Sequence, residues 1–560
     1  MRRAAAVWTV GLGLILVAAM SGPAYAAGPE VWTANAFEQI LQPTPRPAGA
    51  ATSISWDAAR NERQSAQVLL RHTAAFTVTG VTFTDLAGPA TLGRGNLSFK
   101  LQQYYDADGN GGGHPDPLSN DPTVAVGANA TQGIWLTVDV PRGQAAGPYS
   151  GNATVHTTAG EKVVPIALTV YAVEIPDPAD SEYVSGTWSV FMNGYADSDG
   201  GIIADEIWDK YRYPRYSPQW WTLMDNIAEE MKAQRHNQLH VSIDLVLDGG
   251  SRLVNGQYTF DWSRFDQFIE RFLAHGAVTT FRGNPLLNAG PGGSNKVWII
   301  NSSGKIGQAA VGSVDANRWL NAYIPALKAH LDAKGWTARW YQTISDEPSN
   351  PSNYADLVAL YRSYFGPIST IQDAINGRST DYVGSVDIWI PSVQEFEDAD
   401  GWYGGRQELG EQVWSYTCGF CSDPADGWLD RMTLQAPSTA KLIAWGNYRY
   451  GITGFFHWGY NAWAESGYTG TGGGEPRPGD GYIVYPDPAN TTVRSSVRGI
   501  ATRDGHEDYE LLRILGERDP AAAHDLARSL VESFDVYSTD PAFIAQQSKA
   551  LLVAAANAVN

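Results

Sequence analysis

The feature that most restricts the fold of this chain is a regular alternation of short apolar stretches and amphipathic stretches after residue 179. The amphipathic stretches have helical periodicity at 220–235, 262–275, 316–334 and 354–364. Alternating strands and helices are typical of a parallel sheet, and eight such units can close into a barrel. The eight apolar stretches are Gly186–Phe191, Leu239–Ile243, Ala277–Phe281, Arg339–Ile344, Ile368–Ile371, Val386–Ile390, Gln412–Tyr416 and Gly451–Trp458.

An open, doubly wound sheet would show the same alternation. Sheets of that kind that bind nucleotides carry a glycine-rich phosphate turn after the first strand, and none follows the first apolar stretch here. The sequence therefore predicts a (β/α)8 TIM-like barrel over residues 179–518.

The regions on either side of the barrel have different patterns. Residues 66–71, 76–83, 133–140 and 163–171 alternate in polarity or are rich in β-branched residues, and turn residues separate them. These patterns predict an N-terminal antiparallel β-sandwich domain over residues 27–178, which ends at the proline-rich linker Ile175–Asp180. Residues 519–560 are alanine-rich, and we expect a short C-terminal helical segment there. The chain is thus expected to have several domains.

The N-terminus has the pattern of a secretory signal. Arg2 and Arg3 precede the apolar stretch Val10–Met20, and Ala24 and Ala26 form a small-residue cleavage pattern. We therefore expect a signal peptide over residues 1–26 and a secreted, extracellular protein. No later stretch is apolar and long enough to cross a bilayer, so we expect no stable membrane insertion.

Charge and aromatic content indicate the kind of partner. The chain has 39 lysines and arginines against 59 acids, a net charge of −20, which disfavours a nucleic-acid partner because phosphates would be repelled. Aromatic residues make up 11% of the chain, with 20 tryptophans, and flat aromatic faces are common where proteins bind sugars. We expect a glycan or glycoconjugate substrate.

No cofactor and no metal are expected at the main site. Cys418 and Cys421 have neither a second cysteine pair nor histidines at zinc-ligand spacing, so they are expected to form a short disulfide or to remain as two buried thiols. The loop Asp106–Asn110 resembles the start of a calcium-binding loop. Its twelfth position, where a glutamate is needed, is Pro117, and calcium there is left open.

Two neighbouring acids follow the fourth predicted strand. Asp346 and Glu347 precede Pro348, at the end of a strand where barrel enzymes place their active sites. Glycoside hydrolysis needs a protonated carboxyl for the leaving oxygen, and Glu347 beside a negative Asp346 is suited to that task. We expect Pro348 to end the strand and to favour an extended Glu347. The alternative is that both acids belong to a helix start, where they favour the helix dipole.

Aromatic and amide side chains gather near the ends of the later predicted strands. Sugar rings stack on aromatic faces, and Asn and His side chains hydrogen-bond sugar hydroxyls. A cluster of such residues at one end of a barrel therefore favours a sugar-binding site beside the two acids. The predicted substrate-binding residues are Trp389, Trp414, His457, Trp458, Asn461 and Trp463.

Several motifs together resemble glycoside hydrolase family 123, and the resemblance extends over most of the chain after residue 26. Their order along the chain is more specific than any one of them. The motifs are Pro115–Leu118, Asp346–Pro348, Val386–Pro391, Val413–Cys418, Gly454–Trp458, Gly479–Pro486 and Arg498–Leu512.

The resemblance implies a β-sandwich followed by a (β/α)8 barrel. It also implies release of terminal β-linked N-acetylgalactosamine, or a related N-acetylhexosamine, by a substrate-assisted retaining mechanism in which the acetamido oxygen attacks the anomeric carbon. Carried onto this chain, Glu347 would be the general acid/base, Asp346 would orient the acetamido group and Tyr416 would hydrogen-bond its oxygen.

Two other interpretations stay open at this point. One is a glycosidase for a sugar without an acetamido group, which uses two separate carboxylates; Glu395 or Asp244, each near the end of a predicted strand, would be the second one. The other is a non-catalytic carbohydrate-binding barrel in which Asp346 and Glu347 are only a helix cap.

Overall fold

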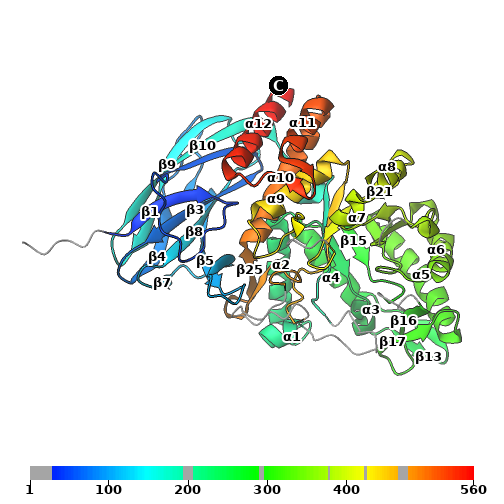
Figure 1. The fold of residues 1–560 in the computed structure, drawn as a ribbon. Helices are drawn as coiled ribbons and strands as arrows, with labels where there is room; N and C mark the ends of the chain where they lie inside the picture. The colour runs from blue at the N-terminus through cyan, green and yellow to red at the C-terminus, as the bar shows by residue number, and fades with distance from the viewer. Residues whose placement is uncertain are drawn as a thin grey trace, which may run out of the picture.

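The computed structural model describes residues 28–192, 206–288, 295–375, 379–421, 426–464 and 477–559. The expected signal peptide, residues 1–26, lies outside the described residues. Figure 1 shows a strand-rich N-terminal part beside a larger part in which helices surround a sheet, with the C-terminal helices at the junction between them.

The N-terminal part consists of two sheets that enclose one apolar core. Successive side chains of a strand point to opposite faces, so alternate residues such as Val68, Leu70, Ile134 and Leu136 face this core. One sheet has the order β1 (Glu30–Asn35), β3 (Arg63–Arg71), β8 (Thr131–Asp139), β5 (Leu97–Tyr105), β6 (His114–Ser119), β25 (Thr492–Ser496), β24 (Tyr485–Asp487). The other has the order β2 (Ile54–Arg60), β10 (Lys162–Glu174), β9 (Gly147–Thr157), β4 (Phe76–Phe83), β7 (Val124–Val126).

Two strands of the first sheet come from a distant part of the chain. β24 and β25 pair with each other, and Ser495 and Ser496 of β25 pair with Leu118 and Pro117 of β6. Both strands lie inside the range 179–518 that the sequence assigns to the barrel. No local pattern marks such a return, because the pairing partner lies hundreds of residues away.

The larger part contains a parallel sheet that is nearly closed on itself. Its order is β21 (Gln412–Val413), β20 (Ile388–Trp389), β19 (Thr370–Asp373), β18 (Trp340–Gln342), β15 (Thr280–Gly283), β12 (Gln238–Val241), β11 (Val184–Thr187), β23 (Gly454–His457), β22 (Ser415–Thr417). The two end strands, β21 and β22, are separated in sequence only by Trp414. Each of the eight predicted apolar stretches overlaps a strand of this sheet, which confirms their order, although several strands begin or end a few residues away from the predicted bounds.

Helices cover the outside of this sheet and the junction (Figure 1). Four of them, α2, α4, α5 and α6, confirm the four helical patterns in the sequence. The helices are α1 (Glu206–Tyr211), α2 (Pro218–Ala233), α3 (Asp244–Gly249), α4 (Ser263–Ala274), α5 (Val314–Lys334), α6 (Pro351–Phe365), α7 (Val393–Glu397), α8 (Asp400–Glu408), α9 (Ser438–Arg449), α10 (Val497–Gly516), α11 (Pro520–Leu530) and α12 (Pro541–Val559). Three hairpins complete the described strands: β13 (Arg252–Val254) with β14 (Gln257–Thr259), β16 (Lys296–Ile300) with β17 (Ile306–Ala310), and β26 (Val531–Ser533) with β27 (Val536–Tyr537).

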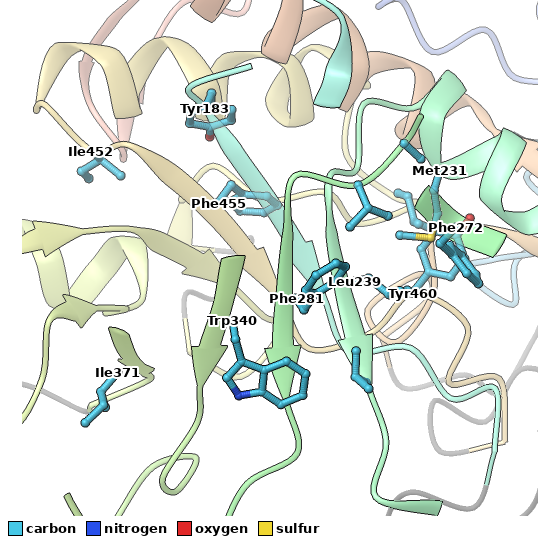
Figure 2. Close-up of a cluster of buried hydrophobic side chains, with 14 of the residues drawn as sticks. Tyr183, Met231, Leu239, Phe272, Phe281, Trp340, Ile371, Ile452, Phe455 and Tyr460 are labelled. Carbon is cyan, nitrogen blue, oxygen red and sulfur yellow. The ribbon is translucent and has the colours of Figure 1, made fainter. Parts of the chain in front are cut away.

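The two faces of the barrel-like sheet differ in polarity. Leu239, Phe281 and Trp340 belong to one large apolar core together with helix residues such as Phe272 (Figure 2). Polar side chains of neighbouring positions are buried on the other face, where the Gln238 Nε2 donates to Gln372 Oε1 over 2.9 Å. Alternation along each strand therefore turns one set of side chains toward the helices. The other set faces inward, where hydrogen-bonded glutamines are buried beside apolar residues such as Ile388 and Phe456.

A buried charge network on α10 joins the two parts. The Arg498 guanidinium lies 2.9 Å from Asp116 of β6, the Arg235 guanidinium lies 3.0 Å from Glu507, and Lys441 pairs with Asp508. The motifs around Asp116 and Arg498, which carry part of the family resemblance, thus meet in space. Of these three pairs, Arg498 with Asp116 spans the two parts, and separating them would leave a buried charge without its partner. None of the described helices is long and apolar enough to cross a membrane.

Candidate active site

A cavity of about 860 Å³ opens where several strands of the barrel-like sheet end. Asp346 and Glu347 follow β18 and line it, and so does Tyr416 of β22. Aromatic rings form much of the remaining wall: Trp188 follows β11, Phe456 lies in β23, and Trp458 follows it. The structure thus brings the predicted acid pair and Tyr416 into one cavity with aromatic walls.

The two acids do not form the cap of the next helix. α6 begins only at Pro351, and its N-cap is Asn350, whose side-chain oxygen accepts from the Asn353 backbone N–H over 3.0 Å. Glu347 is exposed and Asp346 is half-buried at the cavity. The helix-start interpretation of the acid pair is therefore wrong, because a different residue satisfies the free N–H groups of the helix.

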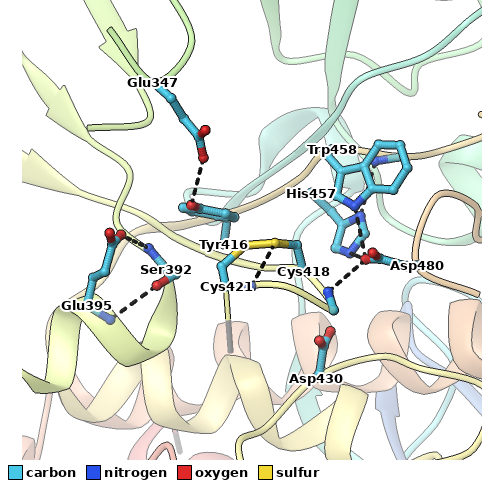
Figure 3. The surroundings of a disulfide bond; sticks show 12 residues. Glu347, Ser392, Glu395, Tyr416, Cys418, Cys421, Asp430, His457, Trp458 and Asp480 are labelled. Atoms are coloured by element: carbon cyan, nitrogen blue, oxygen red, sulfur yellow. Dashed lines mark hydrogen bonds and ion pairs between the residues drawn. A yellow bond between two sulfur atoms is a disulfide. The ribbon is translucent and has the colours of Figure 1, made fainter. Parts of the chain in front are cut away.

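The backbone of Glu347 differs from the expected extended conformation. Its φ is 45°, in the left-handed region that non-glycine residues rarely adopt, at a cost of about 1–3 kcal/mol. A hydrogen bond of 3.0 Å from the Glu347 N–H to the Ala374 carbonyl holds this conformation. The Tyr416 hydroxyl donates to Glu347 Oε1 over 3.3 Å (Figure 3). In this backbone conformation the Glu347 carboxylate lies against Tyr416 at the cavity.

The surroundings of Asp346 and Tyr416 set their protonation. Burial raises the pKa of Asp346 to about 6, although Arg282 lowers it, and Glu347 raises it further. Asp346 is therefore mostly ionised at neutral pH. Burial also raises the pKa of Tyr416, with help from the charges of Glu395 and Glu347, so its hydroxyl remains a hydrogen-bond donor.

Arg282 supports the floor of the cavity. It is fully buried, and its guanidinium carbon lies 4.0 Å from the ring centroid of Trp188 and 3.9 Å from that of Phe456. Its Nε donates to Thr343 Oγ1 over 2.8 Å. One cation thus holds two rings of the cavity wall in place and supplies positive charge near Asp346.

Asp373 at the end of β19 holds the segment that carries the acids. Its Oδ2 accepts from the Ile344 backbone N–H over 3.0 Å and from the Tyr354 hydroxyl over 2.6 Å. Burial raises the pKa of Asp373 well above its usual range. These two hydrogen bonds fix the chain two residues before Asp346.

A disulfide forms another part of the cavity wall. Cys418 and Cys421 are bonded, which decides between the two alternatives left by the sequence. The Gly419 N–H donates to Asp480 Oδ1 over 3.0 Å, and the Trp458 Nε1 donates to the same oxygen over 2.9 Å (Figure 3). The disulfide loop and the Trp458 ring are therefore tied to one carboxylate.

Of the six residues predicted to bind substrate, only Trp458 lines the cavity. The other five are buried away from it. A position near a strand end does not reveal which face of the sheet a side chain occupies. All five side chains make hydrogen bonds or packing contacts within the protein. Trp389 donates to Glu411, Trp414 packs in the core, His457 accepts from the Gly459 N–H, Asn461 bonds the Val190 backbone, and Trp463 donates to the Val484 carbonyl.

The two alternative carboxylates lie in different places. Glu395 lines the cavity, and its side chain accepts from the Ser392 N–H in a capping box at the start of α7. Asp244 lies outside the cavity, where its Oδ2 accepts from the Ser242 hydroxyl over 2.8 Å. The sequence analysis did not single out Trp188 or Phe456, although both line the cavity and lie within predicted strands. The type of the neighbouring residues does not show which side chains of a strand face the cavity.

The carboxylates of the possible calcium loop are used within the loop itself. Asp106 Oδ1 accepts from the Gly111 N–H over 2.7 Å, and Asp108 Oδ1 accepts from the Asn110 N–H over 3.0 Å. Within the described ranges, no group of three or more His, Cys, Asp or Glu side chains is arranged to hold a metal ion. Whether this loop binds calcium stays open.

The raised pKa of Asp346 has a consequence for stability. The folded protein keeps this proton up to about pH 6, whereas the unfolded chain releases it near 3.8, so wild-type stability falls as pH rises through this window. Asp346→Asn is therefore expected to raise the free energy of unfolding at pH 7 by up to about 2–3 kcal/mol, and to have little effect at pH 4. Urea unfolding at both pH values measures the difference, with the exposed Asp381→Asn as the control. An equal effect at both pH values would contradict this assignment.

The comparisons with known proteins agree with the geometry. The model of the glycoside hydrolase 123 catalytic domain matches residues 203–515, and that of the glycoside hydrolase 123 N-terminal domain matches residues 39–157. A family 123 glycoside hydrolase from Clostridium perfringens has a similar structure, with a TM-score of 0.73 at 15% identity, over 95% of this chain and 99% of that one. No match was found among curated proteins.

Weaker structural similarities extend to other sugar-cleaving enzymes. A family 10 xylanase from termite gut gives a TM-score of 0.33 at 11% identity, over 82% of this chain and 100% of that one. An endo-β-1,4-mannanase from Thermotoga petrophila also gives 0.33 at 11% identity, over 60% and 78%. Scores this low support no argument about this chain.

A nearly closed parallel sheet with an acid pair at a cavity where its strands end, together with these matches, defines a glycoside hydrolase. The catalytic-domain match alone covers more than half of the 560 residues. The chain belongs to glycoside hydrolase family 123.

Proposed function

We propose that this enzyme releases terminal β-linked N-acetylgalactosamine, or a related N-acetylhexosamine, by a substrate-assisted retaining mechanism. The observation that carries the proposal is that Asp346, Glu347 and Tyr416 line the same cavity, with the Tyr416 hydroxyl hydrogen-bonded to the Glu347 carboxylate. Adjacent acids act from one side of a sugar more readily than from opposite faces. The similar Clostridium perfringens enzyme acts in glycolipid glycan hydrolysis, which is consistent with a glycan substrate.

Each residue has a defined role in this mechanism. Glu347 donates a proton to the glycosidic oxygen while the acetamido oxygen attacks the anomeric carbon, and the bond to the leaving alcohol breaks. The product is an oxazolinium ion, and ionised Asp346 accepts the acetamido N–H and stabilises its positive charge. The Tyr416 hydroxyl donates to the acetamido oxygen. The Glu347 carboxylate then removes a proton from the water that opens the ring with net retention.

We also propose the wider setting of this activity. The eight strand positions and the proximity of β21 to β22 support a (β/α)8 TIM barrel as the catalytic fold. The N-terminal pattern of positive, apolar and small residues supports export of the enzyme, which would bring it to extracellular glycans.

A second candidate rests on Glu395. This side chain lines the same cavity as Glu347, so the two could form a conventional pair for a sugar that lacks an acetamido group. In that mechanism the second carboxylate attacks the anomeric carbon or activates the water. Asp346 would then influence the pair only through its charge.

A panel of aryl glycosides with and without the acetamido group distinguishes the two candidates. We expect cleavage of an aryl N-acetyl-β-hexosaminide and competitive inhibition by the thiazoline analogue of the intermediate, because it mimics the ring that the acetamido group forms. Cleavage of only the non-acetamido sugars, with a covalent adduct trapped by a fluorosugar, would favour the second candidate. Binding of glycans without any cleavage would contradict both.

A further inference from the structure

An unusual aromatic residue lies at the rim of the cavity. Phe420 lines the cavity but is 76% exposed, whereas Trp188 and Phe456 deeper in the same cavity are buried. It belongs to the loop between Cys418 and Cys421. An exposed aromatic ring beside a cavity offers a flat apolar face, and covering that face with a ligand would remove its apolar surface from water.

Arg477 is placed on this ring. Its guanidinium carbon lies 3.3 Å from the Phe420 centroid, and the side chain is half-buried at the cavity. Among the described residues, it is the one lysine or arginine on the cavity wall, and its guanidinium forms no hydrogen bond or ion pair with another described residue. A guanidinium has five N–H donors in a fixed plane, so this one is available for acceptors on a ligand.

The surroundings hold this pair in place. The disulfide closes the loop, and the Gly419 N–H is bonded to Asp480. A Cβ added at Gly419 would come within 2.2 Å of the Arg477 Cδ, so the loop backbone packs directly on the Arg477 stem. A ring and a guanidinium held by a covalent bond, a hydrogen bond and close packing form a preorganised surface, which lowers the entropic cost of binding.

We propose that Phe420 and Arg477 form a second sugar subsite, which binds the residue on the leaving-group side of the scissile bond. This inference rests on the proposed function: the terminal sugar occupies the deep part at Asp346 and Tyr416, and the next sugar extends toward the rim. One sugar face stacks on the open part of the Phe420 ring, and Arg477 donates to hydroxyl oxygens.

The charge of the cavity selects the class of sugar at this subsite. In the part of the chain that the structure describes, five carboxylates line the cavity against one cation, that of Arg477. An acidic sugar would meet net repulsion, whereas a neutral sugar offers hydroxyl acceptors without that cost. We therefore assign the subsite to a neutral hexose or N-acetylhexosamine. The five carboxylates are those of Asp346, Glu347, Glu395, Asp398 and Asp480.

The test compares two substrates with the same terminal sugar. One is a disaccharide with a neutral second sugar, and the other is a trifluoroethyl glycoside, whose leaving group is too small to reach the rim. Phe420→Ala and Arg477→Met are each expected to lower kcat/KM for the disaccharide about tenfold, the equivalent of one lost contact of about 1.4 kcal/mol. The trifluoroethyl glycoside should be cleaved within about twofold of wild type.

Two variants serve as matched controls. Arg449→Met removes an arginine stacked 4.5 Å from the Tyr450 ring, and Leu409→Ala removes a side chain that is 70% exposed; neither residue lines the cavity. Both should cleave the two substrates as wild type does. Thermal unfolding of every variant confirms that it is folded, and Arg477→Lys, which keeps the charge but loses the planar donors, should give an intermediate loss on the disaccharide.

Several outcomes would overturn the subsite. Equal losses on both substrates would show that the pair supports the reacting centre or the fold, and unchanged rates on the disaccharide would show that no second sugar binds there. A larger loss on a disaccharide with an acidic second sugar would overturn the assignment to neutral sugars. If wild type cleaves neither substrate, the proposed function itself fails.

Discussion

Glu347→Gln is expected to lower kcat/KM for an alkyl N-acetyl-β-hexosaminide by a factor of about 10³, because glutamine has nearly the same shape but cannot donate a proton to the leaving oxygen. Its backbone at φ 45° and its contact with Tyr416 can both be kept, so the fold should be retained. The loss should be smaller for a dinitrophenyl glycoside, whose leaving group needs little protonation. Steady-state kinetics on the two substrates measure both effects.

Glu408→Gln is the matched control for this experiment. Glu408 ends α8 on the exposed surface, so the same chemical change there should leave the rate unchanged. If Glu347→Gln instead cleaves the alkyl glycoside at the wild-type rate, this carboxyl is not the acid. Another group on the cavity, with Glu395 as the first candidate, would then have to deliver the proton.

The second large effect is expected at Asp346. Asp346→Asn should lower kcat/KM for the acetamido substrate by a factor of about 10², since a neutral amide no longer stabilises the positive oxazolinium ion. The wild-type rate should rise with pH through about pH 6, where Asp346 loses its proton. This acid limb should be absent from the pH profile of the Asn variant. The profiles of kcat/KM for the two proteins measure the difference.

A parallel series with Glu395→Gln separates the mechanisms. Under substrate assistance, Glu395→Gln should reduce the rate much less than Asp346→Asn, because the acetamido group replaces a second carboxylate. The reverse order of effects, with a fluorosugar adduct lost only in Glu395→Gln, would instead identify Glu395 as the nucleophile. Either order therefore decides between the two candidate mechanisms.

The order of strands and helices could be predicted from the sequence, whereas the composition of the cavity wall could not. The stretch Val386–Ile390 contains the strand β20, and the stretch Leu239–Ile243 overlaps the strand β12. Trp389 and Trp463, in contrast, are buried and bonded to other parts of the protein. Periodicity reveals an element and its spacing, but a tryptophan near a strand end has the same local pattern whether it faces a ligand or the core.

The pairing of β25 with β6 and the placement of Arg477 on Phe420 were equally inaccessible to sequence reasoning. Each depends on segments that lie dozens to hundreds of residues apart and that meet only once the chain has folded. The same holds for the raised pKa of Asp346, whose main cause is burial by the folded structure. A local pattern contains no information on these contacts.

The sequence by itself determined the order of the eight strand stretches and four of the helices around them, the two adjacent acids before Pro348 and the family, because local periodicity and short motifs lie in consecutive residues. Only the tertiary structure decided that Asn350, and not the acid pair, caps α6 and that the Tyr416 hydroxyl forms a hydrogen bond with Glu347. It also decided that the disulfide loop brings Phe420 to the cavity rim. The physical reason is that burial, side-chain direction and pairing depend on contacts between distant residues, which exist only in the folded chain.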